Sequence, residues 1–204
     1  MKIALITDTH FGARNDSLIF TDFFRKFYEN IFFPTLKERG ITEVIHLGDV
    51  VDRRKFINYK TLNSMKDILF TPLKEMGGKI KIIVGNHDIY YKNTLRVNSP
   101  ELLLAEYENI TIISEPTELS VGGCDFILIP WICDENRERT FESIASSNAS
   151  VCLGHLELNG FEAVPGHTME HGQDPSIFDK FDLTCTGHFH MRSRTVSYTH
   201  LRAH

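Results

Sequence analysis

The chain has 204 residues, of which 42% are hydrophobic and 24% charged, and its formal net charge is −5 at pH 7. This length suits one sizeable domain with a buried core, and the acidic balance argues against broad nucleic-acid binding by charge alone. No apolar run approaches the length of a membrane span, so we expect no membrane segment. The four cysteines form no Cys-x-x-Cys pair, which favours reduced core thiols in a cytoplasmic protein.

The first predicted strand covers residues 3–7 and runs directly into Asp8-Thr9-His10. A helix follows over 16–39, indicated by apolar residues that recur every four positions. Pro34 should interrupt this helix and Gly40 should end it. Its many aromatic residues exceed what one sheet face needs. They can be plain core, or part of this face can meet another subunit.

A second strand, over 42–47, leads to Asp49. His46 lies within this strand and is expected to be a core histidine with satisfied hydrogen bonds. A charged loop follows, and its three adjacent cations, Arg53 to Lys55, could hold a phosphate backbone or could simply be solvated. Helical spacing then predicts a helix over 59–76.

The central strand, over 80–84, is an apolar run that climbs to Gly85. Asn86, His87 and Asp88 follow at once. Glycine lets the backbone turn sharply, and ligands bind beyond the carboxyl ends of strands in open α/β sheets. Asn86 can therefore offer a carbonyl oxygen to a metal, and His87 can donate a proton.

The second half of the chain begins with a helix that Ser99 should cap, with Pro100 at its first position. Residues 110–113 then begin a different texture of short strands with turns between them, which suggests antiparallel pairing in a second sheet. The loop over 160–175 carries His167 and His171, which are expected at the surface or beside the ligands. The remaining predicted elements are strands over 110–113, 117–121, 124–129, 151–154 and 183–187 and a helix over 137–146.

Five strand-like runs end on side chains that bind metals. These side chains are Asp8, His10, Asp49, Asn86, His155, His188 and His190. Seven ligands are too many for one four-coordinate site, but they suit two metals that share a carboxylate. The mixture of oxygen and nitrogen ligands favours manganese, iron or zinc over calcium.

The motifs at these strand ends resemble those of the calcineurin-like metallophosphoesterases. The motifs are Asp-Thr-His (8–10), Gly-Asp (48–49), Gly-Asn-His-Asp (85–88), Gly-His (154–155) and Gly-His-Phe-His (187–190). Together with Ile-Pro-Trp (129–131) and the stretch 154–161, they are similar to the SbcD-type DNA repair nucleases, including phage-encoded nuclease subunits. The resemblance covers residues 1–191 and implies an α/β fold: a β-sandwich flanked by helices in four layers, αββα.

The resemblance also implies roles for the site residues. Asp49 would bridge two ions, most often Mn²⁺. Apart from the resemblance, His87 stands next to the ligand Asn86 and is placed to protonate the leaving oxygen, and Asp88 could either orient His87 or cap a loop or helix. The remaining ligands would divide into Asp8, His10 and His190 on one ion and Asn86, His155 and His188 on the other.

The function that this resemblance implies is metal-dependent cleavage of DNA by an exo- or endonuclease subunit of a recombination and repair complex. The implied partners are DNA, an SMC-like ATPase subunit and a second copy of the chain, contacted through the helices over 16–39 and 59–76. The alternatives are a phosphoesterase for a small phosphodiester or a phosphoprotein, and a binding scaffold without chemistry.

Similar nucleases continue beyond the last motif, so we expect residues 1–195 to be a nuclease domain truncated at its C-terminal side, with an incomplete second sheet. Residues 196–204 no longer resemble the family. We expect them to be a tail that docks onto nothing.

Overall fold

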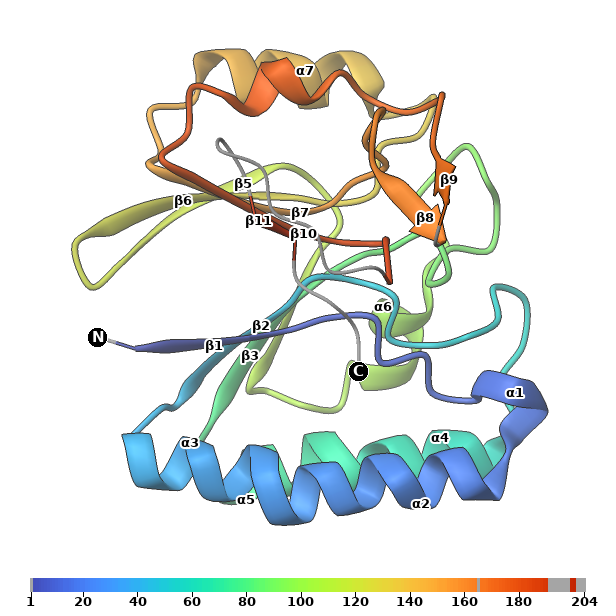
Figure 1. Ribbon diagram of the computed structural model, residues 1–204. Coiled ribbons are helices and arrows are strands. Elements are labelled where there is room, and N and C mark those ends of the chain that lie inside the picture. The colour runs from blue at the N-terminus through green and yellow to red at the C-terminus, as the bar shows by residue number, and fades with distance from the viewer. Residues whose placement is uncertain (1, 165, 191–198, 201–204) are drawn as a thin grey trace.

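The computed structural model describes residues 2–164, 166–190 and 199–200. Two sheets lie face to face, and helices cover the outer face of each, so the layers run αββα (Figure 1). This is the four-layer α/β architecture that the resemblance to the metallophosphoesterases implies. Fully buried side chains from both sheets, among them Leu47, Ile83, Leu128 and Leu153, form a core that joins the two sheets.

The first sheet is entirely parallel, with strand order β1-β2-β3-β4. Its strands are β1 (Ile3–Ile6), β2 (Glu43–His46), β3 (Lys79–Ile83) and β4 (Ile110–Ile113). The prediction that 110–113 begins the second sheet is therefore wrong. Helix α6 (Ser99–Leu104) precedes β4, and a helical crossover returns the chain as a parallel neighbour, whereas a tight turn would have given an antiparallel one.

Two long helical segments cover the outer face of the first sheet (Figure 1). Each widens into a π-helical turn just before a proline, Pro34 or Pro72. Proline has no N–H for the i→i−4 ladder, which accounts for the local widening. The elements are α2 (Leu18–Phe27), η1 (Tyr28–Phe32), α3 (Phe33–Arg39), α4 (Tyr59–Met65), η2 (Lys66–Phe70) and α5 (Thr71–Glu75).

The second sheet has the order β11-β10-β7-β6-β5. Only the β5–β6 pair is antiparallel; the other neighbours are parallel. Helix α7 (Arg137–Ser146) and the short η3 (Pro175–Phe178) accompany this sheet. Its strands are β5 (Thr117–Val121), β6 (Cys124–Ile129), β7 (Val151–His155), β10 (Leu183–Gly187) and β11 (Thr199–His200).

Three local predictions change in the structure. The predicted loop over 160–175 contains a small hairpin, β8 (Glu162–Val164) with β9 (His167–Thr168). Asn98 rather than Ser99 caps α6, because its side chain accepts the N–H of Glu101 at 3.0 Å. Within the described residues, the cysteines form no disulfide and no helix is long and apolar enough to cross a membrane.

The expected tail over 196–204 lies mostly outside the described residues. Two of its residues are described: Thr199 and His200 form β11, which pairs with Cys185 and Thr186 of β10. The expectation that the tail docks onto nothing is therefore wrong for these two residues, because they occupy the edge of the second sheet.

Candidate metal centre

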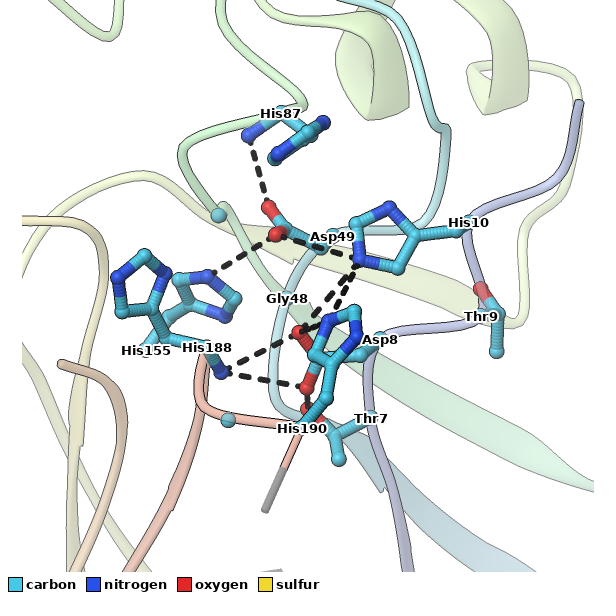
Figure 2. Close-up of polar contacts among 12 residues, drawn as sticks. Thr7, Asp8, Thr9, His10, Gly48, Asp49, His87, His155, His188 and His190 are labelled. Carbon is cyan, nitrogen blue, oxygen red and sulfur yellow. Dashed lines mark hydrogen bonds and ion pairs between the residues drawn. The ribbon is translucent and has the colours of Figure 1, made fainter. Parts of the chain in front are cut away.

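The candidate site lies where strands of both sheets end. β1 and β2 run into Asp8 and Asp49, β3 leads to Asn86, and β7 and β10 of the second sheet lead to His155 and His188. Figure 2 shows the imidazole rings arranged around the two aspartates. All seven predicted ligand side chains lie in this one cluster, because parallel strands present their carboxyl ends at the same edge of a sheet.

The first group of side chains gathers around Asp8. Its Oδ1 lies 3.7 Å from His10 Nε2 and 3.5 Å from His190 Nε2. The two ring nitrogens are themselves 3.1 Å apart. Asp8 is oriented by its neighbours: the hydroxyl of Thr7 donates to Oδ2 at 2.5 Å, and the His188 N–H points at both oxygens from 3.2 Å. Asp8, His10 and His190 could together hold one metal ion.

The second group gathers around Asn86. The Nδ1 of His155 lies 2.7 Å from the carbonyl oxygen of Leu47, which can only accept, so Nδ1 carries the proton. Nε2 is then the nitrogen left to bind either a metal ion or a second proton, and it faces Asn86 Oδ1 at 2.9 Å. His188 Nδ1 faces the same amide oxygen at 3.0 Å. Acceptor atoms converge on a space that needs a cation or a proton.

Asp49 lies between the two groups (Figure 2). Its Oδ2 is 3.7 Å from His10 Nε2 and 3.3 Å from His155 Nε2, while Oδ1 accepts the backbone N–H of His87 at 2.8 Å. Asp49, His155 and His188 form a second group that could hold an ion. The geometry therefore fits two metal ions with one shared carboxylate.

The pKa values reflect the close packing of opposite charges. Burial alone would raise the pKa of Asp49, but the charges of His155 and His10 hold it at about 2. Burial likewise opposes ionisation of His155, yet Asp49 and Asp8 raise its pKa to about 9. His188 differs, because burial and the neighbouring charge of His155 lower its pKa to about 4. These buried carboxylates stay negative and attract positive charge, as a metal site requires.

The backbone at the site is strained. Asp8, His10, Asp49 and His188 have positive φ angles of 51°, 41°, 58° and 90°. Non-glycine residues rarely adopt this conformation, and where they do the strain often accompanies a functional site. Gly85 permits the close approach: a Cβ there would lie 2.3 Å from Asp49 Oδ1.

His87 forms a further possible ligand group with His10 and Asp49, and it helps to line a pocket of about 410 Å³. Its Nδ1 is 2.5 Å from the carbonyl oxygen of Asp52 and must donate to it. This contact leaves Nε2 as the nitrogen that can exchange a proton with the pocket. The ring also packs edge-on against His10, with the centroids 4.8 Å apart.

Asp88 does not orient His87. Its buried carboxylate accepts backbone N–H groups from Asp49, Val50 and Gly85 at 2.9 Å and from Val51 at 3.2 Å. Burial and the charge of Asp49 raise the pKa of Asp88 to about 7, and the N–H donors oppose that rise. Asp88 therefore ties together the loops after β2 and β3, so the loop-capping alternative holds and the orienting role is wrong.

Other candidates from the sequence lie outside the cluster. Buried His46 accepts the Gly48 N–H through Nδ1 at 3.1 Å and contacts the hydroxyl of Thr9 at 3.0 Å, so it is the satisfied core histidine that we predicted. The charged loop, for which phosphate binding and simple solvation were both open, makes contacts within the protein: Arg53 pairs with Asp16, and Arg54 donates to a backbone carbonyl. His167 and His171 are exposed and belong to none of the ligand groups.

Sequence reasoning missed part of the pocket wall. Asp52 lines the pocket, and its Oδ1 lies 3.8 Å from His10 Nδ1, a buried atom that lacks a hydrogen bond among the described residues. Arg14, Phe20 and Phe24 line it as well. Periodicity placed the two phenylalanines on a helix, but only the folded chain shows that they face the ligands.

Residues 1–192 match the family described as Calcineurin-like phosphoesterase. The chain belongs to this family. The phosphoesterase is also 37% identical over 205 residues to Exonuclease subunit 1 of Enterobacteria phage T4, a match that covers 98% of this chain and 58% of that protein. Membership implies a hydrolase of phosphate esters that uses divalent metal ions, and the ligand groups above agree with it.

Among solved structures, the phosphoesterase is similar to a protein of unknown function, AQ665, from Aquifex aeolicus. The TM-score is 0.42 with 20% identity, over 75% of this chain and 77% of that one. Similarity at this level adds nothing to the assignment.

Proposed function

We propose that this phosphoesterase is a dinuclear-metal nuclease that hydrolyses phosphodiester bonds in DNA. The observation that carries the proposal is the convergence of imidazole nitrogens and of amide and carboxylate oxygens on two adjacent points. At one point His155 Nε2 faces Asn86 Oδ1, and at the other the His10 and His190 Nε2 atoms face each other across 3.1 Å. Nitrogen and oxygen atoms packed so closely need a proton or a cation between them, and a cluster of imidazoles and carboxylates is the ligand set that metal cations bind.

The ligand division expected from the family fits these contacts. Asp8, His10 and His190 would hold one ion, Asn86, His155 and His188 the other, and Asp49 would touch both. When bound, two such ions supply charge neutralisation at the phosphate and activation of the attacking water. The mixed nitrogen and oxygen ligands suit manganese, and the family resemblance points to the same metal.

His87 would serve as the general acid. The carbonyl of Asp52 fixes the proton on Nδ1, so Nε2 is the atom that delivers a proton to the leaving oxygen. The backbone N–H of His87 also binds Asp49 Oδ1, which couples the position of the acid to that of the shared ligand. In this proposal the metal ligands and the proton donor are therefore different residues.

DNA as the substrate rests on the T4 relative, whose printed name is that of an exonuclease subunit. The word subunit also supports a partner protein, and we propose an SMC-like ATPase and a second copy of the chain. Because this chain spans 58% of the length of that relative, the activity of the whole protein goes beyond what these residues show. A small phosphodiester or a phosphoprotein remains the alternative substrate, since the ligands alone suit all three.

Two measurements test the proposal. Metal analysis after loading with Mn²⁺ should find two ions per chain, and Asp49→Ala should lose them, because Asp49 Oδ2 lies 3.7 Å from His10 Nε2 and 3.3 Å from His155 Nε2, one ligand of each proposed ion. Cleavage should then be compared on short DNA duplexes, a chromogenic phosphodiester and a phosphopeptide. Two ions retained at wild-type affinity by Asp49→Ala would refute the shared ligand, and turnover confined to the phosphopeptide would refute the nuclease.

A further inference from the structure

One part of the pocket wall consists of side chains that do not bind metal ions. Beside the ligands and His87, the pocket is lined by Arg14 and by the rings of Phe20 and Phe24. We propose that Arg14 and Phe20 form a subsite for the nucleotide next to the bond that is cut. Arg14 would bind its phosphate and Phe20 would stack on its base. The proposal deepens the nuclease function and rests on it.

Charge points to Arg14 as the phosphate contact. The pocket contains the carboxylates of Asp8, Asp49 and Asp52, and Arg14 is the one arginine or lysine among the described residues that line it. Arg53, farther along the chain, is held by Asp16, whereas the Arg14 guanidinium carbon lies 5.8 Å from the centre of the Phe20 ring. The guanidinium therefore lies over the ring, and the pair offers a cation to the phosphate and an aromatic side chain to the base of one nucleotide.

The turn that carries Arg14 is held in an unfavourable conformation. Arg14, Asn15 and Asp16 have φ angles of 53°, 58° and 59°. Three consecutive residues in the left-handed conformation are rare when none of the three is glycine. Asp16 holds the turn: it accepts the Thr61 hydroxyl at 2.6 Å and pairs with Arg53. Strain that the surroundings maintain beside a ligand pocket indicates that the position of the turn matters.

The aromatic part of the wall comes from one face of α2. Phe20 and Phe24 are four residues apart and therefore share a helix face, and their ring centroids lie 6.5 Å apart. Phe24 packs against the core, while Phe20 remains 40% exposed. A volume of about 410 Å³ is within the range of small-ligand sites. A phosphopeptide offers no flat base to such a ring, so a nucleotide is the occupant that uses both groups.

The test is a binding measurement that needs no turnover. The probe is the 5′-monophosphate of 2-aminopurine deoxyriboside, a monoester whose fluorescence falls when its base stacks. Wild-type protein should quench it saturably. Phe20→Ala should abolish the quenching and weaken binding about 5- to 150-fold, the loss expected for one base–aromatic contact. Phe20→Tyr, which keeps an aromatic ring, should quench and bind the probe like wild type.

Arg14→Ala should weaken binding and flatten its dependence on salt, since one phosphate contact is removed. Asp16→Ala should weaken it in the same way, because the turn is released although Asp16 does not line the pocket. The matched controls are Arg39→Ala, an exposed arginine at the end of α3, and Tyr91→Ala, an exposed aromatic residue outside this pocket. Both should bind the probe like wild type.

Unchanged quenching in Phe20→Ala would overturn the subsite, and so would equal losses in the two controls. These outcomes are separate from the fate of the nuclease proposal. If the protein cleaves DNA but the base does not stack on Phe20, the nuclease proposal holds and the subsite proposal is wrong. If the base stacks on Phe20 but the protein cleaves only phosphopeptides, the nuclease proposal is wrong.

Discussion

His155 and His87 make the same Nδ1 hydrogen bond but have different surroundings. In each ring Nδ1 donates to a backbone carbonyl, that of Leu47 for His155 and that of Asp52 for His87. The free nitrogen of His155 faces Asn86 and the carboxylate of Asp49, which suits a ligand. His87 lines the pocket instead, which suits a proton donor.

We therefore expect His87→Ala to keep both metal ions and to lose activity about 10²- to 10⁴-fold, the usual contribution of a positioned acid. Metal analysis and single-turnover rates on the same preparation would show this. His171→Ala, which removes an exposed histidine outside the ligand groups, is the control. Loss of metal from His87→Ala would make His87 a ligand, and a wild-type rate would remove it from the mechanism.

His46 gives a prediction for stability against pH. Burial lowers its pKa to about 3, from an ordinary value of 6.5. Between these values the unfolded chain binds a proton that the folded chain does not, so stability is complete above pH 6.5 and falls as the pH drops towards 3. The loss approaches about 1.4 kcal/mol per pH unit.

Urea unfolding at about pH 7 and about pH 5 would measure this loss. In His46→Asn the amide oxygen can still accept the Gly48 N–H that Nδ1 now accepts, but nothing titrates at this position. The variant should lose less stability than wild type over the same interval. Equal losses in the two proteins would show that His46 does not cause the pH dependence.

At the scale of elements, the loops after β2 and β3 are held together by one buried side chain. Asp88 accepts four backbone N–H groups across these loops, including that of Asp49. The loops carry the shared ligand, the amide ligand and the acid, so their relative positions depend on this carboxylate.

Asp88→Asn should therefore lower the free energy of unfolding by about 1–3 kcal/mol, because the amide NH₂ group cannot accept and leaves buried donors unpaired. Mn²⁺ affinity should fall with it, which calorimetric titration would reveal. Asp125→Asn on β6 makes the same chemical change at an exposed position and should alter neither quantity. Wild-type stability and affinity in Asp88→Asn would show that the carboxylate is not the element that joins the loops.

At the scale of the whole molecule, the helical layer under the first sheet leaves apolar side chains uncovered. Leu18, Ile19, Phe23 and Ile31 are 55%, 80%, 64% and 57% exposed. Exposed apolar groups gathered on one layer are typical of an interface, in agreement with the dimer expected from the family.

Light scattering at tens of micromolar should find a dimer, and Ile19→Glu should shift it to monomer, because a charge cannot be buried there unpaired. The comparison is Leu102→Glu on α6, where the side chain is 70% exposed and lies on another layer. A wild-type monomer at this concentration would contradict the dimer.

The sequence by itself determined the parts of this protein that depend on neighbouring residues. An apolar run that ends in a ligand can be read along the chain, and the cluster brings together every predicted ligand from Asp8 to His190. The strands over 117–121 and 124–129 and the helix over 137–146 have the predicted bounds for the same reason. The spacing of apolar side chains and the positions of turn residues depend only on residues that are close together in the sequence.

Only the tertiary structure decided what depends on contacts between distant residues. It placed Ile110–Ile113 in the first sheet, because pairing follows the path of the crossover rather than the composition of the strand. In the folded chain, the Asp88 carboxylate accepts backbone N–H groups 37 to 39 residues away and does not contact the His87 ring as an orienting group. The tertiary structure also turned Arg14 and Phe20 towards the ligands. A side chain's partners across the fold are set by how the whole chain packs, which spacing along the sequence does not record.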